Sequence, residues 1–175
     1  MRILELTNKE CFEVLTRLRL GRLACSRDDQ PYITPIYFAY HQRHLYSFAT
    51  RGQKIAWMRT NPLICVEVDE IVSRYDWMSV IVQGRYEELL DTPEWKLERE
   101  LAHGLLQQEA MWWEPVYVRP AHLSATDEVI PIYYRLHIDQ VTGRRTRPDP
   151  VDAATQIKSE TPPKKESWLK QLLHR

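Results

Sequence analysis

The segment ATRGQK, residues 49–54, carries the side chains best suited to binding a ligand, and a predicted strand meets a predicted helix there. The first turn of a helix presents unpaired backbone N–H groups and the positive end of the helix dipole, and both attract anions. Gly52 lets the backbone approach an anion closely, Lys54 adds a full positive charge, and Thr50 adds a hydroxyl group. The segment therefore has the chemistry of a phosphate site, although the same residues would also suit an ordinary capped helix with a solvated lysine.

The aromatic segment YITPIYFAY, residues 32–40, favours the phosphate-site interpretation. Pro35 falls in the middle of this predicted strand, and because proline cannot donate a backbone hydrogen bond, the strand is expected at a sheet edge or a bulge. Free backbone groups beside a phosphate site suit a planar cofactor that carries one phosphate. The chain has neither a GxGxxG nor a Walker lysine motif, so neither a Rossmann dinucleotide site nor a P-loop is expected.

Other kinds of chemical site find little support in the residue spacing. None of the histidines shows HExxH or another zinc-ligand spacing, so no metal site is expected. The six are His41, His44, His103, His122, His137 and His174. No Ser-His-Asp or Cys-His arrangement is evident, and Cys25 lies on a predicted strand where its thiol is expected to be buried. No side chain is therefore predicted to be catalytic.

The composition limits the partners that the protein could have. Lys plus Arg equals Asp plus Glu, at 24 each, so the chain lacks the basic excess typical of nucleic-acid binding. No apolar run is long enough to span a membrane, and the first residues lack the apolar core of a signal peptide. Three cysteines without a CxxC pair fit a reducing compartment. The composition thus predicts a cytoplasmic protein with neither a nucleic-acid nor a membrane partner.

Three helices are predicted to flank the strands. The first begins at a capping box formed by Thr7 and Glu10 and ends at Gly21. The second begins at a capping box formed by Thr50 and Gln53 and ends at an Asn-Pro pair. A third runs over residues 92–108, with a proline at its first position.

The other predicted elements are strands, separated by residues that favour turns. They cover residues 22–49 as three strands with turns at 28–29 and 41–43, then 63–70, 76–89, 111–118 and 128–139, and a further turn is predicted at Thr142-Gly143. Six or seven strands joined mostly by tight turns favour an antiparallel barrel or sandwich. From about residue 144 the composition becomes polar and rich in proline. The prediction is one domain over residues 1–146, followed by a polar linker and a short C-terminal helix in 147–175.

The order of several segments resembles the FMN-binding split-barrel superfamily, which includes the pyridoxamine-5′-phosphate oxidases and the nitroimidazole-resistance proteins. The segments are GRLACS, QPYITPIYFAY, HLYSFAT, GQKIAWMRTNPLICVEVDE and WMSVIVQGRYEEL, followed by WWEP and YYRLHIDQVTGRR. The chain is more similar to the second group, and the resemblance covers about residues 5–146. It implies a mainly β fold, a six-stranded antiparallel split β-barrel with peripheral α-helices, and a homodimer with FMN at the subunit interface.

The resemblance also implies which residues would contact the flavin. The backbone of the segment 34–38 would lie along the flavin ring, the segment 49–54 would bind the ribityl phosphate, and Ser79 would be a polar contact. Trp113 would cover the flavin from the partner subunit, but it would equally suit a core or a dimer interface. The implied cofactor-binding residues are Thr34, Pro35, Ile36, Tyr37, Phe38, Ala49, Thr50, Gly52, Gln53, Lys54, Ser79 and Trp113.

The activity implied by the resemblance is flavin-dependent oxidation or reduction of a small organic molecule, with a reduced nicotinamide as donor. The basic C-terminal motif with which the oxidases recognise their substrate's phosphate has no convincing counterpart, so vitamin B6 oxidation is not expected. Two alternatives stay open. One is a non-catalytic flavin-binding redox or sensor protein, and the other is a haem-binding relative in which His122 or another histidine is the axial ligand.

Overall fold

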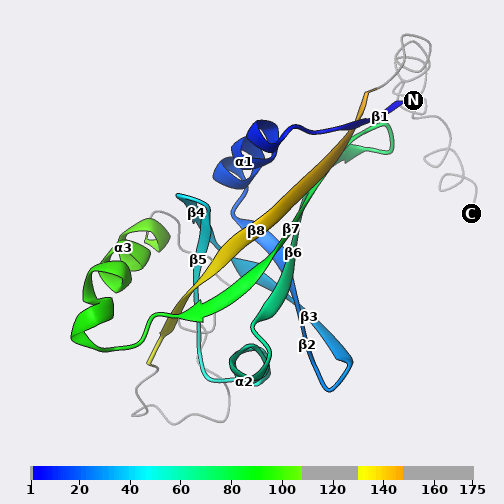
Figure 1. Ribbon diagram of the computed structural model, residues 1–175. Helices are drawn as coiled ribbons and strands as arrows, with labels where there is room; N and C mark the ends of the chain where they lie inside the picture. The colour runs from blue at the N-terminus through cyan, green and yellow to red at the C-terminus, as the bar shows by residue number, and fades with distance from the viewer. Residues whose placement is uncertain (1, 108–129, 148–175) are drawn as a thin grey trace, which may run out of the picture.

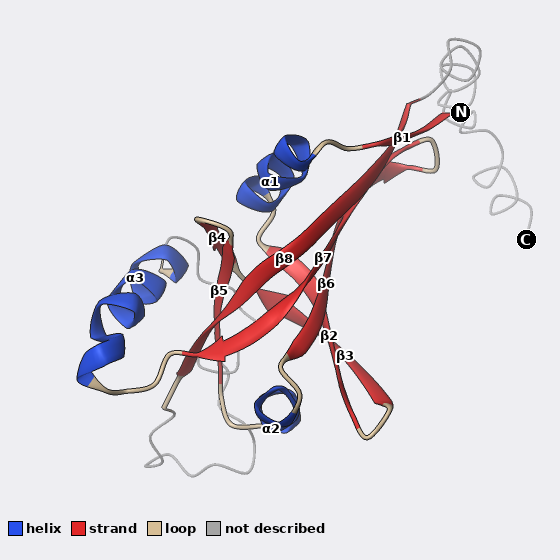
Figure 2. Ribbon diagram, viewed as in Figure 1, coloured by secondary structure: helices blue, strands red, loops and turns tan. Residues whose placement is uncertain are grey.

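The computed structural model describes residues 2–107 and 130–147 of the 175. Figures 1 and 2 show these residues as one curved sheet with helices around it. In chain order the elements are β1 (Arg2–Glu5), α1 (Asn8–Arg17), β2 (Leu20–Arg27), β3 (Gln30–Tyr37), β4 (Ala39–His41), β5 (His44–Ala49), α2 (Gln53–Thr60), β6 (Leu63–Ser73), β7 (Asp76–Glu88), the 3-10 helix η1 (Pro93–Trp95), α3 (Lys96–Leu106) and β8 (Ile132–Arg147).

The eight strands form one antiparallel sheet that closes into a split barrel. Their order is β3-β2-β6-β7-β8-β5-β4, and β1 pairs with β8. The chain passes from β3 to β4 through Phe38 alone, so it crosses directly from one end of this order to the other. At this crossing Ser47 Oγ of β5 donates a hydrogen bond of 2.6 Å to the backbone carbonyl of Tyr37 in β3. This bond joins β3, at one end of the order, to β5, which is next to the other end.

The predicted class, a mainly β antiparallel split barrel with peripheral helices, is confirmed. The strand count is different, because eight strands occur in the described residues alone where six were expected. The additional strands include β1 and β4, which have only four and three residues and are too short to show a period-two pattern.

The barrel interior is filled by alternate side chains of the long strands. These are 1% exposed or less and include Val66, Val68, Val80, Val82, Leu136 and Ile138. Helix α2 contributes the buried Ile55 and Met58 to the same core cluster. Helix α3 packs on the outer face of the sheet, where Ala102 contacts Tyr46 and Leu89 in a second cluster.

The capping box of the first helix is confirmed, but the predicted end of this helix is wrong. Glu10 Oε2 accepts a hydrogen bond of 2.8 Å from the Thr7 backbone N–H, and the Glu10 N–H donates to Thr7 Oγ1 at 3.3 Å. The helix ends at Arg17, and Gly21 lies inside β2. A Cβ at Gly21 would lie 3.0 Å from the carbonyl oxygen of Glu67 and 3.2 Å from the Phe38 ring. The glycine therefore serves close packing and does not end the helix.

Two of the three predicted turns are confirmed, and the third is wrong. Residues 28, 29, 42 and 43 have positive φ values of 51°, 61°, 45° and 64°, as tight hairpin turns require. Thr142 and Gly143 instead lie within β8, which has 16 residues. A Cβ at Gly143 would lie 2.8 Å from both Cys11 Sγ and Leu6 Cδ1. This glycine allows the close approach of α1 and the residues before it.

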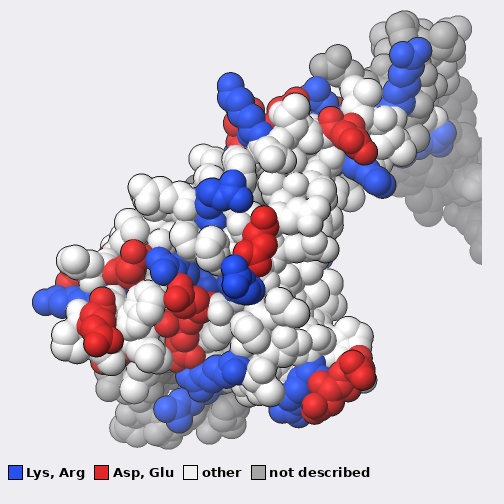
Figure 3. Space-filling view, viewed as in Figure 1, with Lys and Arg blue, Asp and Glu red and all other residues white. Residues whose placement is uncertain are grey.

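The third predicted helix is confirmed in part, since residues 93–95 form a 3-10 turn and α3 begins only at Lys96. The predicted strand 111–118, Trp113, His122 and the tail from residue 148 lie outside the described residues. No helix in the described ranges is long and apolar enough to cross a membrane. Basic and acidic side chains are interspersed on the face shown in Figure 3.

Candidate functional site

The predicted phosphate segment connects the end of β5 to the start of α2 (Figure 1). The predicted capping box of Thr50 and Gln53 is wrong, because the N-cap of α2 is Gly52 and its first turn receives no side-chain cap. Thr50 lies two residues before this N-cap, outside the capping position. The helix end thus has the character of an anion site, since its first N–H groups are not satisfied by a capping side chain.

Neither the conformation nor the packing of Gly52 requires a glycine. Its φ of −178° is extended backbone, and a Cβ placed there would have only the Thr50 carbonyl oxygen nearby, at 4.0 Å. Gly52 is also exposed. The space around Gly52 at the start of α2 is therefore open, and its role at a phosphate stays a prediction.

Lys54 lies beside the hairpin formed by β2 and β3. Burial raises the pKa of the Cys25 thiol in β2, and the nearby positive charge of Lys54 opposes this effect. Cys25 pairs with Tyr32 of β3 in the antiparallel register, so their side chains share one face of the sheet. Thr34 is two residues beyond Tyr32 and shares that face too. Helix α2, which carries Lys54, contacts Tyr32 through its Trp57 ring, so this helix packs on the face of the hairpin that carries Thr34.

Aromatic contacts hold α2 against this hairpin. The Trp57 ring of α2 meets Tyr32 edge-on, with 5.6 Å between the ring centroids. The Arg27 guanidinium lies over the Trp57 ring, 5.3 Å from its centroid. These contacts fix the position of the first turn of α2 relative to β3.

Strand β3 lies at the edge of the sheet, as Pro35 predicted. Within the described ranges it pairs only with β2, and Pro35 is opposite Arg22. The side chains of Ile36, Tyr37 and Phe38 are buried, at 1% exposure or less, whereas Pro35 is exposed and Thr34 is half-buried. The last three predicted ring-binding residues can therefore meet a ligand only through their backbone.

Ser79 lies on the opposite face of the sheet. It alternates along β7 with Val80, whose side chain is in the barrel core together with that of Cys25. The Ser79 hydroxyl donates a hydrogen bond of 3.4 Å to Glu67 Oε1. Within one chain the predicted polar contact is thus on the other side of the sheet from Lys54.

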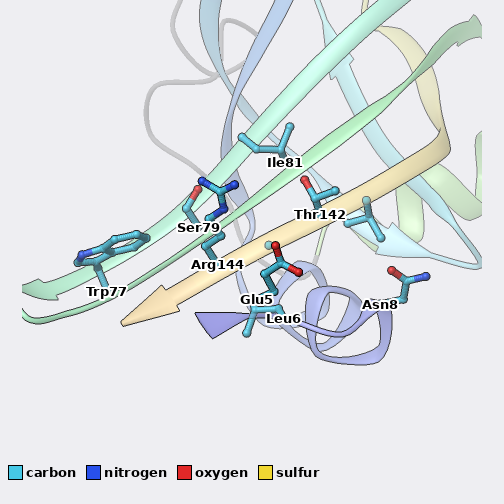
Figure 4. Close-up of a pocket in the computed structure, with 10 residues that line it drawn as sticks. Glu5, Leu6, Asn8, Trp77, Ser79, Ile81, Thr142 and Arg144 are labelled. Carbon is cyan, nitrogen blue, oxygen red and sulfur yellow. The ribbon is translucent and has the colours of Figure 1, made fainter. Parts of the chain in front are cut away.

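A cavity of about 600 Å³ lies on this outer face, next to β1 and α1. Figure 4 shows Trp77, Ser79 and Arg144 among the side chains that line it, together with Glu5 and Thr142. No motif in the sequence predicts this cavity. Its residues come from the two ends of the described chain and from β7, so no local spacing connects them.

Helix α2 is anchored to β7 by a network that the residue spacing could not reveal. Arg59, in the last turn of α2, donates two hydrogen bonds of 2.7 Å to the Glu88 carboxylate. The Tyr86 hydroxyl donates a third, of 2.8 Å, to the same carboxylate. The hydrogen bonds from Arg59 are the main reason why the pKa of Glu88 lies below its ordinary value of 4.5.

We expect Glu88→Gln to lower the free energy of unfolding by about 1–2 kcal/mol at pH 7, because hydrogen bonds to a charged carboxylate are lost. The folded-state pKa of Glu88 is depressed, so its stabilising effect is fully present above pH 4.5 and is lost as the pH falls through the folded-state pKa. The difference between wild type and Glu88→Gln should therefore shrink as the pH drops below 4.5.

Urea unfolding at pH 7 and at about pH 3 checks this expectation. Glu94→Gln is the control, since Glu94 is exposed and makes no ion pair with any described residue. A loss of stability that is equal at both pH values would contradict the assigned role of the carboxylate.

Among residues 2–107 and 130–147, no group of three or more His, Cys, Asp or Glu side chains is arranged to hold a metal ion.

A protein-family model described as pyridoxamine 5′-phosphate oxidase matches residues 7–145, and the chain belongs to this family. The uncharacterized protein RA0666 of Rhizobium meliloti is 41% identical over 139 residues, which are 79% of this chain and 92% of that protein. The crystal structure of a FAD-binding protein from Mesorhizobium loti shares 42% identity with a TM-score of 0.70, and the match covers 85% of this chain and 99% of that chain. The superfamily expected from the sequence is confirmed.

A more distant crystal structure, of a candidate 5-nitroimidazole antibiotic resistance protein from Bacteroides thetaiotaomicron, shares the fold at 15% identity. Its TM-score is 0.58, and the match covers 83% of this chain and 89% of that chain.

Proposed function

We propose that the protein binds FMN, with the phosphate at the start of α2 and the flavin ring along the edge of β3. The observation that carries the proposal is that α2 begins at Gly52 without a side-chain cap, while this helix, which carries Lys54, packs against the open edge strand through the contact of Trp57 with Tyr32. Membership of the oxidase family and the similarity to the Mesorhizobium loti FAD-binding protein support a flavin as the ligand. The single helix end and single lysine suit one phosphate group, which favours FMN over FAD.

The chain's own residues would bind and orient the cofactor. Lys54 and the first N–H groups of α2 would hold the phosphate, and the backbone edge of β3 would bond the polar rim of the ring. When bound, the flavin supplies hydride and electron transfer, so no side chain needs to act as acid or base. The proposed activity is oxidation or reduction of a small organic molecule with a reduced nicotinamide as donor.

The proposal includes a homodimer with the flavin at its interface. Ser79 lies on the opposite face of the sheet from the neighbours of Lys54, so a flavin held at Lys54 would meet this serine only from a second copy of the chain. The same outer face carries exposed apolar side chains, with Ile71 71% and Ile3 57% exposed. Ile71 is paired with Trp77 across β6 and β7, and Ile3 is paired with Thr146 across β1 and β8.

The test is to incubate the purified protein with FMN or FAD, pass it through gel filtration, and record the visible spectrum and the molar mass of the eluted species. Flavin bands that elute with a dimer, with tighter binding of FMN than of FAD, would support the proposal. A Soret band without flavin would favour the haem alternative, and a protein without any band would overturn flavin binding. Steady consumption of a reduced nicotinamide with an acceptor would distinguish an enzyme from a non-catalytic carrier.

A further inference from the structure

Three histidines that are far apart in the sequence form a row across three neighbouring strands. His41 of β4 pairs with His44 of β5, and His44 in turn pairs with His137 of β8. Residues directly opposite on antiparallel strands have their side chains on the same face, with about 4.5–5.5 Å between Cβ atoms. The row therefore places three imidazoles side by side on the outside of the barrel.

Two of these rings are close enough to act together. The ring centroids of His44 and His137 lie 4.8 Å apart, with 30° between the ring planes. His44 Nδ1 lies 2.9 Å from the backbone carbonyl oxygen of Gln42. Because a carbonyl oxygen can only accept, Nδ1 carries the proton, and Nε2 keeps its lone pair when the ring is neutral. His137 is exposed, and its ring makes no hydrogen bond to any residue that the structure describes.

We propose that His44 and His137 together bind a divalent transition-metal ion such as Zn²⁺, Ni²⁺ or Cu²⁺, each through one imidazole nitrogen. Imidazole is a preferred ligand of these ions. A chelate needs the two nitrogens about 3 Å apart, since each lies about 2.0–2.1 Å from the metal. The exposed His137 ring can turn to reach this geometry. Water completes the coordination, in agreement with the absence of a three-residue metal cluster in the described ranges.

Carboxylates neutralise two arginines next to the pair. Arg85 lies opposite His137 on β7, but its guanidinium is bound by Asp139 at 2.9 and 3.0 Å. Arg135 precedes His137 by two residues on β8, and it is bound by Glu87 at 2.6 Å and by Glu98 at 3.4 Å. A third, Arg43, lies over the Phe12 ring, 5.3 Å from its centroid, and donates a hydrogen bond of 3.4 Å to the Ile138 carbonyl oxygen.

The metal pair is separate from the proposed flavin site. His44 begins β5 and Ala49 ends it, so a length of about 17 Å of extended strand separates the histidine row from the start of the phosphate segment. The metal would therefore join β5 to β8 at the far end of the strand that leads to Lys54. The proposal does not depend on a flavin being bound.

The test is titration of the full chain, first treated with chelator, with ZnSO₄ by calorimetry and with CuSO₄ by electron paramagnetic resonance. In wild type we expect one site with nitrogen hyperfine splitting from two imidazoles, and a thermal midpoint that rises with Zn²⁺ because the metal links two strands. His137→Gln removes one of two ligands, so its affinity should fall by roughly tenfold or more, at least as much as loss of an outer-shell partner costs. The Zn²⁺-dependent rise in midpoint should also disappear in this variant.

His103→Gln is the matched control. His103 lies on α3, and its ring nitrogens already face the Tyr133 hydroxyl at 2.8 Å and the Gln107 amide at 2.6 Å. This variant should bind metal like wild type. Unchanged affinity in His137→Gln, or an equal loss in His103→Gln, would overturn the proposal. Because His137 is exposed, its replacement should leave the metal-free thermal midpoint near the wild-type value, which makes either result interpretable.

Discussion

Replacing Gly84 by alanine is expected to lower the free energy of unfolding by about 3 kcal/mol or more. Gly84 is buried in β7 where the pairing with β8 shifts register, so that Gln83 faces Gln140 but Gly84 faces Ile138. A Cβ at this position would overlap the carbonyl oxygen of His137 and lie 3.0 Å from its carbonyl carbon. These are backbone atoms of the adjacent strand, and they cannot move aside without breaking the ladder that holds β7 to β8.

Gly104→Ala is the matched control for this substitution. Gly104 lies within the last turn of α3, it is exposed, and a Cβ there would meet nothing within 4 Å. Alanine is favoured over glycine in a helix interior by about 1 kcal/mol, so this variant should be slightly more stable than wild type. Urea unfolding of the two variants gives the comparison. A Gly84→Ala protein as stable as wild type would show that β8 can shift at the bulge, and it would contradict the close contact between Gly84 and the His137 carbonyl.

Features set by neighbouring residues were predicted well from the sequence. The capping box of Thr7 and Glu10 depends on residues three apart, and both of its hydrogen bonds are present. The turn at Asp28 and Asp29 depends on side chains that tolerate left-handed backbone, and both residues have it. The edge position of Pro35 follows from the missing N–H of that residue alone.

Glycines were misassigned because their role depends on residues far away in the chain. Gly21 and Gly143 have the local features of a helix end and a turn, yet both lie within strands. Each leaves room for another element, Gly21 for the β6 backbone and Gly143 for Leu6 and Cys11. Only the packed barrel reveals such contacts, so a sequence pattern that treats glycine as a breaker is misleading here.

The same contrast between local and long-range features applies to the candidate site. The lysine at the start of a helix and the edge strand could each be predicted because both are local features, and the packing of α2 on the hairpin of β2 and β3 relates them in space. The bond between Arg59 and Glu88, which holds the helix that carries Lys54, joins α2 to a distant strand and has no local signature. Ser79 can be placed on the opposite face only after the structure shows which side of β7 packs into the core.

The second large effect is expected at the proposed phosphate site. Lys54→Ala should weaken FMN binding by about tenfold to a hundredfold, because a charge-assisted contact to the phosphate contributes about 1.5–3 kcal/mol. The fold should be preserved, since α2 keeps Ile55, Trp57 and Met58 in the core and its bond from Arg59 to Glu88. Titration followed by flavin fluorescence gives the affinity, and circular dichroism gives the thermal midpoint.

Lys96→Ala and Lys54→Arg distinguish a phosphate contact from a general charge effect. Lys96, the first residue of α3, is exposed, so its loss removes the same charge from a different helix and should leave FMN affinity unchanged. Lys54→Arg keeps the charge and should retain most of the affinity, whereas riboflavin, which lacks the phosphate, should bind wild type and Lys54→Ala equally. If Lys54→Ala binds FMN as tightly as wild type, the phosphate does not lie at the start of α2. If FMN and riboflavin lose affinity together in this variant, Lys54 acts by supporting the hairpin of β2 and β3 and not by pairing with the phosphate.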